Sequence, residues 1–184
     1  MFRIFHRLRD KRGNVTMLWV AALPVFAILM MVIGTVAVAW MQHATAQTAA
    51  DAASLAVTKK LDQRYYEELD RRLQELAAQG IWDPWNYLLG TPAKKESFMR
   101  HVVNKYQGEL KSVAKEYVTK NGGDNEGTIR LSVSGRVEVT ARQEFKPMIF
   151  EEAFEDTYIK GSGTGPSREH IKWLPEGAIT LHFK

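Results

Sequence analysis

The residue types that most often do chemistry are few in this chain and poorly spaced for it. There are five histidines and no cysteine among the 184 residues, which excludes disulfides, thiolate metal sites and a cysteine nucleophile. No two histidines have the i, i+4 spacing that puts two metal ligands on one helix face. His170 follows Glu169, and Ser167 is nearby, but proximity in sequence does not make a catalytic triad. We therefore predict no catalytic residue, no cofactor and no metal site. The histidines are His6, His43, His101, His170 and His182.

Two further segments resemble ligand-binding motifs only superficially. Residues 161–167 are rich in glycine, but a phosphate-binding loop also needs a lysine after the glycines and an uninterrupted helix start, whereas Pro166 follows here. This segment predicts a flexible loop. Residues 151–156 carry four acidic side chains without the alternating oxygen ligands and central glycine of a calcium loop. They predict a solvated face.

The charge is concentrated at the N-terminus. Residues 1–13 carry five basic residues against one acidic residue, and the other positions carry equal numbers of each sign. The formal charge of +4 therefore belongs to a short tail and not to a basic domain. Nucleic-acid binding needs a basic face on a folded domain, so we predict no nucleic-acid partner.

An apolar segment directly follows this tail. Residues 15–41 contain no charged residue and exceed the roughly 20 residues that a membrane-spanning helix needs. The segment is longer than the apolar region of a secretory signal peptide, which predicts a retained anchor. Trp19 and Trp40 are separated by about 31 Å of helix, so we expect them at the two membrane interfaces. The basic residues precede the span, and the first one after it is Lys59, which predicts a cytoplasmic N-terminus and a single-pass topology.

Small residues follow the apolar segment. Residues 42–56 contain seven alanines, and alanine has the highest helix propensity, so we expect the membrane helix to continue outward. Small side chains at i and i+4, such as Ala49 and Ala53, allow another helix to approach closely. Asp51 has no partner carboxylate nearby in sequence, which indicates a solvated helix residue.

Three pieces of this region together resemble a known family. Arg12-Gly13-Asn14 leads into an apolar run containing Leu23-Pro24, and the helix beyond carries Gln47-Thr48-Ala49-Ala50-Asp51-Ala52-Ala53-Ser54-Leu55-Ala56. This order is similar to the N-terminal module of the TadE/TadG-like Flp pilus-assembly proteins, over about residues 10–60. The resemblance implies a bitopic, pseudopilin-like component of a tight-adherence apparatus, with a structural role. Its implied partners are membrane lipid and other pilus or secretion subunits, with a homo-oligomer as one option. The residues implied in helix packing are Ala49, Ala50, Asp51, Ala52 and Ala53.

The resemblance also implies a processing site. Prepilin peptidases cut after a glycine that is followed by Glu at the fifth position, and here Gly13-Asn14 is followed by Leu18. Gly13 and Asn14 are thus the only candidate site, and the missing acid fits a retained, TadG-type anchor better. The sequence leaves both cleavage and entry into a filament open.

The remaining helices are predicted from periodicity. Leucine and tyrosine recur at three- and four-residue steps over residues 55–79, and Gly80 ends this helix. Thr91-Pro92 has the pattern of an N-cap followed by proline, and apolar positions continue to Tyr117 before a stop at residues 121–123. Between these helices lie three aromatic residues, which favour a loop packed on the core over a ligand-binding patch. They are Trp82, Trp85 and Tyr87.

The C-terminal third predicts strands. Residues 129–141 alternate between apolar and polar, and Ser134-Gly135 fits either a hairpin turn or a bulge in one strand within residues 128–145. A short helix is expected over 148–154 and a closing strand over 177–183. The predicted fold class is α+β, with a long N-terminal transmembrane helix continuing outward, further helices and a small antiparallel, pilin-like sheet.

These expectations divide the chain into a cytoplasmic tail (1–13), a transmembrane helix (14–42), an alanine-rich extension (43–80) and an extracytoplasmic α+β domain (81–184). The predicted function is a non-enzymatic membrane component of a Tad/Flp-type pilus or a related secretion apparatus. The alternative is a membrane-anchored ligand-binding or sensing module that uses Trp82 and Trp85.

Overall fold

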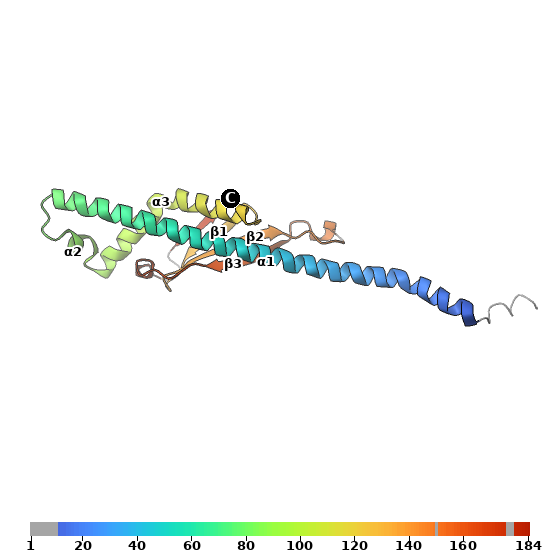
Figure 1. The fold of residues 1–184 in the computed structure, drawn as a ribbon. Coiled ribbons are helices and arrows are strands. Elements are labelled where there is room, and N and C mark those ends of the chain that lie inside the picture. The colour runs from blue at the N-terminus through green and yellow to red at the C-terminus, as the bar shows by residue number, and fades with distance from the viewer. Residues whose placement is uncertain (1–10, 150, 176–178) are drawn as a thin grey trace, which may run out of the picture. The chain divides into compact units, whose positions relative to one another are not determined.

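The computed structural model describes residues 11–149, 151–175 and 179–184, and it confirms the α+β class (Figure 1). The helix α1 covers Lys11–Ala78, and α2 (Pro84–Leu89) and α3 (Pro92–Lys120) follow it. Four strands come next, with two short 3-10 helices between them. The strands are β1 (Gly127–Leu131), β2 (Val137–Glu144), β3 (Tyr158–Thr164) and β4 (Ile179–Phe183), and the 3-10 helices are η2 (Glu151–Phe154) and η3 (Ile171–Trp173).

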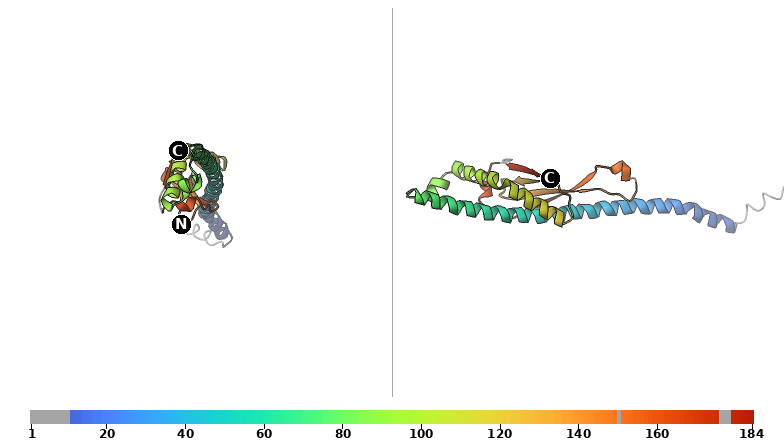
Figure 2. Two further views of the ribbon diagram at one scale, coloured as in Figure 1. Left: turned by 90° about the vertical axis from the view of Figure 1, so that its left-hand side faces the viewer. Right: turned by 90° about the horizontal axis from the view of Figure 1, so that it is seen from above.

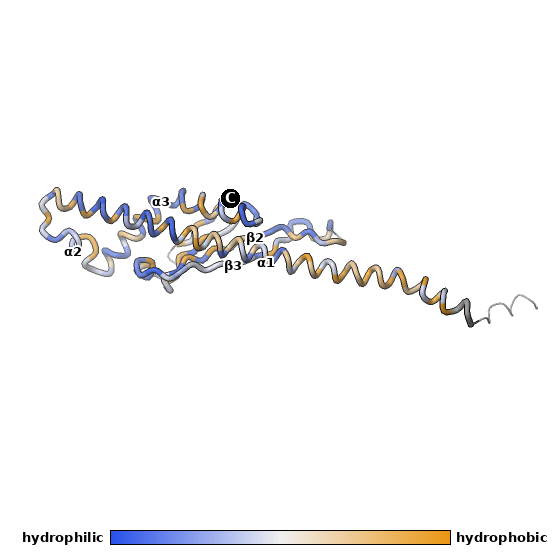
Figure 3. The backbone as a smooth tube through the Cα atoms, in the orientation of Figure 1, coloured by the Kyte–Doolittle hydropathy of each residue, from blue (hydrophilic) through white to orange (hydrophobic). Residues whose placement is uncertain are grey.

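The chain divides into two compact units. The first contains the N-terminal part of α1 up to Trp40 together with Lys146–Glu155, and the second contains Met41–Phe145 and Asp156–Lys184. α1 is one continuous helix of 68 residues with Pro24 inside it. From Val15 to Trp40 most of its residues are apolar, as the hydropathy colouring shows (Figure 3), and many of their side chains are exposed.

The second unit is built on a four-stranded antiparallel sheet in the order β3-β2-β1-β4. β1 and β2 form a hairpin, which settles the alternative that the sequence left open. Gly135 adopts a φ of 78° in the turn and donates its N–H to Ser132, and such a φ favours glycine. The buried positions on β1 and β2 alternate as predicted, and Val133 lies exposed in the turn.

One face of this sheet carries a gradient of side-chain size. The register aligns Gly163, Val139, Ile129 and Leu181 in one row across the four strands. The neighbouring row contains Gly161, Ala141, Gly127 and Phe183. The largest side chains thus lie on β4 and the smallest on β3.

Two antiparallel helices pack with the sheet to form the core. The C-terminal half of α1 and α3 lie side by side (Figure 2), joined by the ion pairs Arg64–Glu109 and Glu68–Lys105. α3 begins at the predicted cap, where the Thr91 hydroxyl accepts a hydrogen bond from the N–H of Lys94. Buried residues from α1, α2, α3, η3 and the strands form one continuous hydrophobic core.

Three expectations need correction or completion. The glycine-rich segment 161–167 is not a flexible loop throughout, because its first four residues belong to β3. The predicted helix over 148–154 is shorter, and η2 covers only Glu151–Phe154. The predicted closing strand is present as β4, and the start predicted for it at 177–178 lies outside the described residues. The short helix α2, which begins with the Asp83 side chain accepting from the N–H of Asn86, was not predicted.

Candidate functional site: a small-residue helix on a glycine edge strand

The small-residue part of α1 packs directly on β3. A Cβ atom added to Gly161 would overlap the backbone of Ala46 and Gln47, and one added to Gly163 would overlap the backbone of Ala50 and Asp51. At Gly165, just beyond β3, it would overlap the Thr58 hydroxyl. Glycine therefore recurs at every second position, 161, 163 and 165, because atoms of α1 occupy the space that a side chain would take.

The two elements match in repeat distance. Four residues of α-helix advance about 6 Å, and two residues of a strand advance about 6.6 Å. Ala46 and Ala50 therefore meet Gly161 and Gly163 one after the other. Small residues on both elements bring the backbones close together, as small residues do between packed helices.

Polar side chains of α1 also hydrogen-bond to the free edge of β3. The Gln47 side chain donates to the carbonyl of Ser162 over 2.6 Å and accepts from its N–H over 3.1 Å. One turn earlier, the Nδ1 atom of His43 lies 3.2 Å from the carbonyl oxygen of Lys160. Since β3 is an edge strand, these contacts occupy backbone groups that would otherwise be open to another chain. The Gln47 amide also lies 3.4 Å from Asp51 Oδ2, a longer contact that orients it.

The residues predicted for helix packing are thus divided between two environments. Ala49, Ala50 and Ala53 are fully buried within their own chain. Asp51 is exposed and Ala52 is half-buried, so these two present accessible surface. Sequence reasoning missed Gln47 and the glycines as contact residues, although the alternation of glycine at 161, 163 and 165 was a period-two signal for a strand.

Farther along α1, a buried carboxylate joins the two long helices. The Glu68 side chain has no exposed surface. It accepts hydrogen bonds from Lys105 over 2.6 Å, from Tyr106 and from Arg71, and His101 lies 3.2 Å away. Burial opposes its ionisation, but the hydrogen bonds from Arg71, Lys105 and His101 outweigh that effect and lower the pKa of Glu68 to about 2.

A second polar cluster lies where β3 leads into η3. His170 is buried and stacks on Tyr65 with ring centroids 4.2 Å apart, and its Nε2 atom lies 3.2 Å from Asp62 Oδ1. Burial lowers the pKa of His170, and the nearby Asp62 carboxylate opposes this shift. The Ser167 hydroxyl donates instead to the carbonyl of Ser134. The structure therefore does not bring Ser167 and His170 together as nucleophile and base.

The predicted packing of the aromatic cluster on the core is wrong. Trp82 is completely exposed, and Trp85 and Tyr87 are each more than half exposed. From α2 it is Leu89 that enters the core. The three aromatic rings thus form an accessible surface near the far end of α1.

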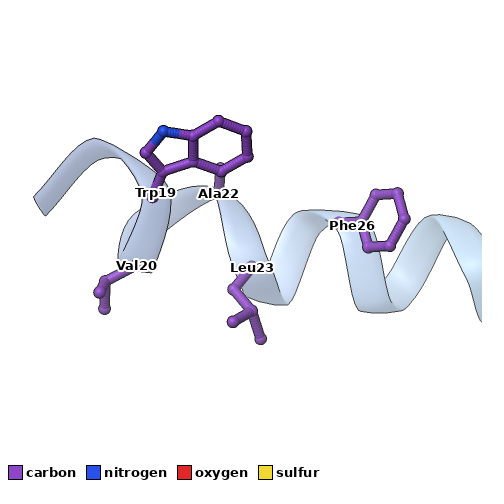
Figure 4. Close-up of a pocket in the computed structure, with 5 residues that line it drawn as sticks. All are labelled: Trp19, Val20, Ala22, Leu23 and Phe26. Atoms are coloured by element: carbon purple, nitrogen blue, oxygen red, sulfur yellow. The ribbon is translucent and has the colours of Figure 1, made fainter. Parts of the chain in front are cut away.

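The N-terminal half of α1 differs from the C-terminal half, because its apolar side chains are exposed and not buried against other elements. Residues 15–78 include a stretch long and apolar enough to span a membrane, the only such helix in the described part of the chain. Trp19 and Trp40 are both about three-quarters exposed. The hollow beside Trp19, Leu23 and Phe26 is lined by α1 residues alone, which project from the helix (Figure 4). Gly13 and Asn14 lie in the first turns of α1.

Within the described residues, no three His, Cys, Asp or Glu side chains are grouped so as to hold a metal ion. The arrangement that remains is an apolar helix whose continuation is held by a glycine strand. The apolar part of this helix is long enough to cross a bilayer.

Comparison with known proteins gives a family match for the N-terminal part of the chain. Neither a curated protein nor a solved structure matches the chain. A family model does match residues 13–59, which include both the apolar half of α1 and the residues that contact β3. The matching family is described as "Putative Flp pilus-assembly TadE/G-like", and the match agrees with the resemblance seen in the sequence.

Proposed function

We propose that the protein is a bitopic membrane component of a Tad/Flp-type pilus or a related secretion apparatus. It acts in assembly or as a minor pseudopilin, and its role is structural and not enzymatic. The observation that carries this proposal is the family match over residues 13–59. The matched range includes both the apolar part of α1 and the small residues that pack on β3. Membrane lipid and other subunits of the apparatus are its partners.

The proposed orientation follows from charge. The basic tail over residues 1–13 stays in the cytoplasm, one helix within residues 14–42 crosses the membrane, and the C-terminal domain lies outside. Fusion of alkaline phosphatase to the C-terminus tests this orientation, because the enzyme is active only outside the cytoplasm. Fusion of a cytoplasmic fluorescent protein at the same position should stay dark, and the reverse pattern would overturn the orientation.

The outward face of α1 is the proposed contact surface for partner subunits. Thr48, Asp51 and Leu55 are exposed there, and Ala52 is half-buried between them. Leu55 is 59% exposed, an apolar side chain with little cover from its own chain. Small residues beside one larger apolar residue suit close packing against a second helix.

Complementation tests this surface. A strain lacking its own copy of the gene would express the wild type or Leu55→Arg, and surface pili would be counted. We expect Leu55→Arg to reduce assembly at least tenfold while protein levels and protease resistance stay unchanged. The matched control is Gln74→Arg, on the same helix but outside the matched segment, which should assemble pili normally. Normal assembly by Leu55→Arg would refute a role for this surface.

The mass of the mature protein decides between the two structural roles. A chain that starts at Asn14 would show cleavage after Gly13 despite Leu18, and it would favour a pseudopilin. A chain that retains residues 1–13 would favour a fixed, TadG-type anchor. Intact-mass measurement of protein purified from native membranes separates these outcomes.

One observation favours a second function. The exposure of Trp82, Trp85 and Tyr87 suits a stacking surface for a ligand such as a carbohydrate. In that case Trp82→Ala with Trp85→Ala should abolish function in the same complementation assay, and Leu55→Arg should not.

A further inference from the structure

The segment Lys146–Glu155 belongs to the same compact unit as the apolar part of α1. Pro147 is buried, and Met148 lies directly against Gly34 of the helix. A Cβ atom added to Gly34 would be only 2.5 Å from the Met148 sulfur atom. Gly34 therefore forms a slot that Met148 fills.

The segment exposes two kinds of side chain. Met148 is 64% exposed and Phe154 is 39% exposed, so both offer apolar surface. Glu151, Glu152 and Glu155 are exposed as well. A mixture of apolar and acidic side chains is unsuited to the hydrocarbon core, where carboxylates are strongly unfavourable. It is suited to the interface, where one side of an element contacts acyl chains and the other contacts headgroups.

The acidic side chains of this segment limit how many residues of α1 can lie within the hydrocarbon core. Residues 15–33 alone measure about 28 Å as a helix, close to the hydrocarbon thickness of about 30 Å. The apolar run continues to residue 41, so hydropathy by itself does not locate the boundary. Glu151 and Glu152 follow Met148, the residue against Gly34, by three and four positions. Their carboxylates supply the missing constraint, because hydrocarbon that extended to Trp40 would enclose this segment.

We propose that Lys146–Glu155 is a second membrane-contacting element. It lies on the bilayer surface at the C-terminal end of the span, at the height of Gly34. Met148 and Phe154 contact the outer ends of the acyl chains, and the three carboxylates face headgroups and water. The hydrocarbon core then covers about residues 15–33, and Trp40 lies about 10 Å beyond it, farther out than the interface position expected from the sequence. The inference rests on the proposed insertion of α1.

The absence of cysteine allows a clean test with single spin labels. Full-length protein carrying one cysteine at position 29, 36, 40, 148 or 133 would be labelled and reconstituted in phosphatidylcholine vesicles. Collisions with oxygen, which concentrates in hydrocarbon, would be compared with collisions with a water-soluble nickel chelate. Val133, exposed in the β1–β2 turn, is the aqueous reference, and Leu29 is the hydrocarbon reference.

We expect the label at 148 to match that at 36, with nickel accessibility between those of the two references. The label at 40 should approach the aqueous reference. The proposal is overturned if position 148 is as accessible to nickel as position 133, or if positions 36, 40 and 148 are all as protected as position 29. If position 29 itself is accessible to nickel, the helix is not inserted and the proposed function fails separately.

Filling the slot gives a second, independent readout. Gly34→Leu should displace Met148 and raise the nickel accessibility of a label at 148 at least threefold. Ala37→Leu adds the same bulk at an exposed position of the same helix and should leave that label unchanged. Equal accessibility in both variants would show that Met148 does not depend on Gly34 and would overturn the docking of this segment.

Discussion

The two halves of α1 share one helical backbone but differ in the environment of their side chains. Around Val25 and Ile28 the side chains are apolar and 60–67% exposed. Between Ala46 and Leu69 one face is buried to 5% or less against protein. The first half exposes apolar side chains that suit an apolar solvent. The second half is covered by α3 and the sheet of the same chain. Helical propensity is thus common to both, and the environment separates them.

The largest expected effect comes from breaking the contact between the second half and β3. Gly163→Val should destabilise the fold by about 3 kcal/mol or more, because the new side chain must displace the Ala50 backbone. Urea unfolding of the full-length protein in detergent, followed by near-UV circular dichroism, would measure this. Thr164→Val, at the next and exposed position of β3, should change stability by less than about 0.5 kcal/mol. Equal unfolding midpoints for the two variants would contradict the packing.

The second effect isolates the first half. Ile28→Asp should cost about 3 kcal/mol of membrane insertion, since a carboxylate near the centre of a span is unfavourable. Alkaline extraction of membranes should release this variant and retain the wild type. Leu55→Asp, at a side chain of nearly equal exposure in the second half, should remain in the membrane. Extraction of both variants to the same extent would remove the distinction between the halves.

The third effect tests the charge buried between α1 and α3. The pKa of Glu68 is lowered to about 2 from an ordinary value of 4.5. A carboxyl group whose pKa is lowered by folding stabilises the folded state at any pH above its pKa in the unfolded chain. This stability is lost as the pH falls through the pKa of the group in the folded state. About 2 kcal/mol should therefore disappear between pH 4.5 and 2. Across this range the urea midpoint should change less for Glu68→Gln than for the wild type, and it should change as in the wild type for the exposed control Asp70→Asn.

The smallest effect concerns the edge of β3. Gln47→Ala removes both hydrogen bonds to Ser162 and should cost about 1–2 kcal/mol. Gln74→Ala, at an exposed position on the same helix, should cost almost nothing. The free edge should also increase self-association of the domain, which sedimentation velocity would detect. A variant that is as stable and as monodisperse as the wild type would show that Gln47 does not protect the strand.

Local sequence patterns predicted the helices and strands well where the pattern repeats over many residues. The apolar run, the helical periodicity of residues 55–79 and the Thr91-Pro92 cap all correspond to observed elements. The prediction of a loop failed at 161–164 because glycine carries no apolar side chain to mark a buried face. It also failed at Trp82 and Trp85, where aromatic composition suggested burial and the short helix α2 buries Leu89 instead.

At the candidate site, the sequence indicated the close packing of α1 but not the strand on which it packs. The small residues at 46–53 indicated close packing, because side-chain size is a property of the sequence. The partner of that packing was not indicated, because Ala50 and Gly163 are more than a hundred positions apart in the chain. Likewise, no local pattern indicated that Lys105 and His101 pair with Glu68, because they lie more than thirty positions away in the chain.

The sequence by itself determined the long apolar helix, its continuation and the α+β class, because each depends on composition or short-range periodicity, and residues 13–59 carried the resemblance to a pilus-assembly family. The tertiary structure alone decided which alanines are buried, which strand covers them, where the charge of Glu68 is compensated and that Met148 fills the slot at Gly34. These features arise from contacts between distant segments, and such contacts leave no local periodicity in the chain.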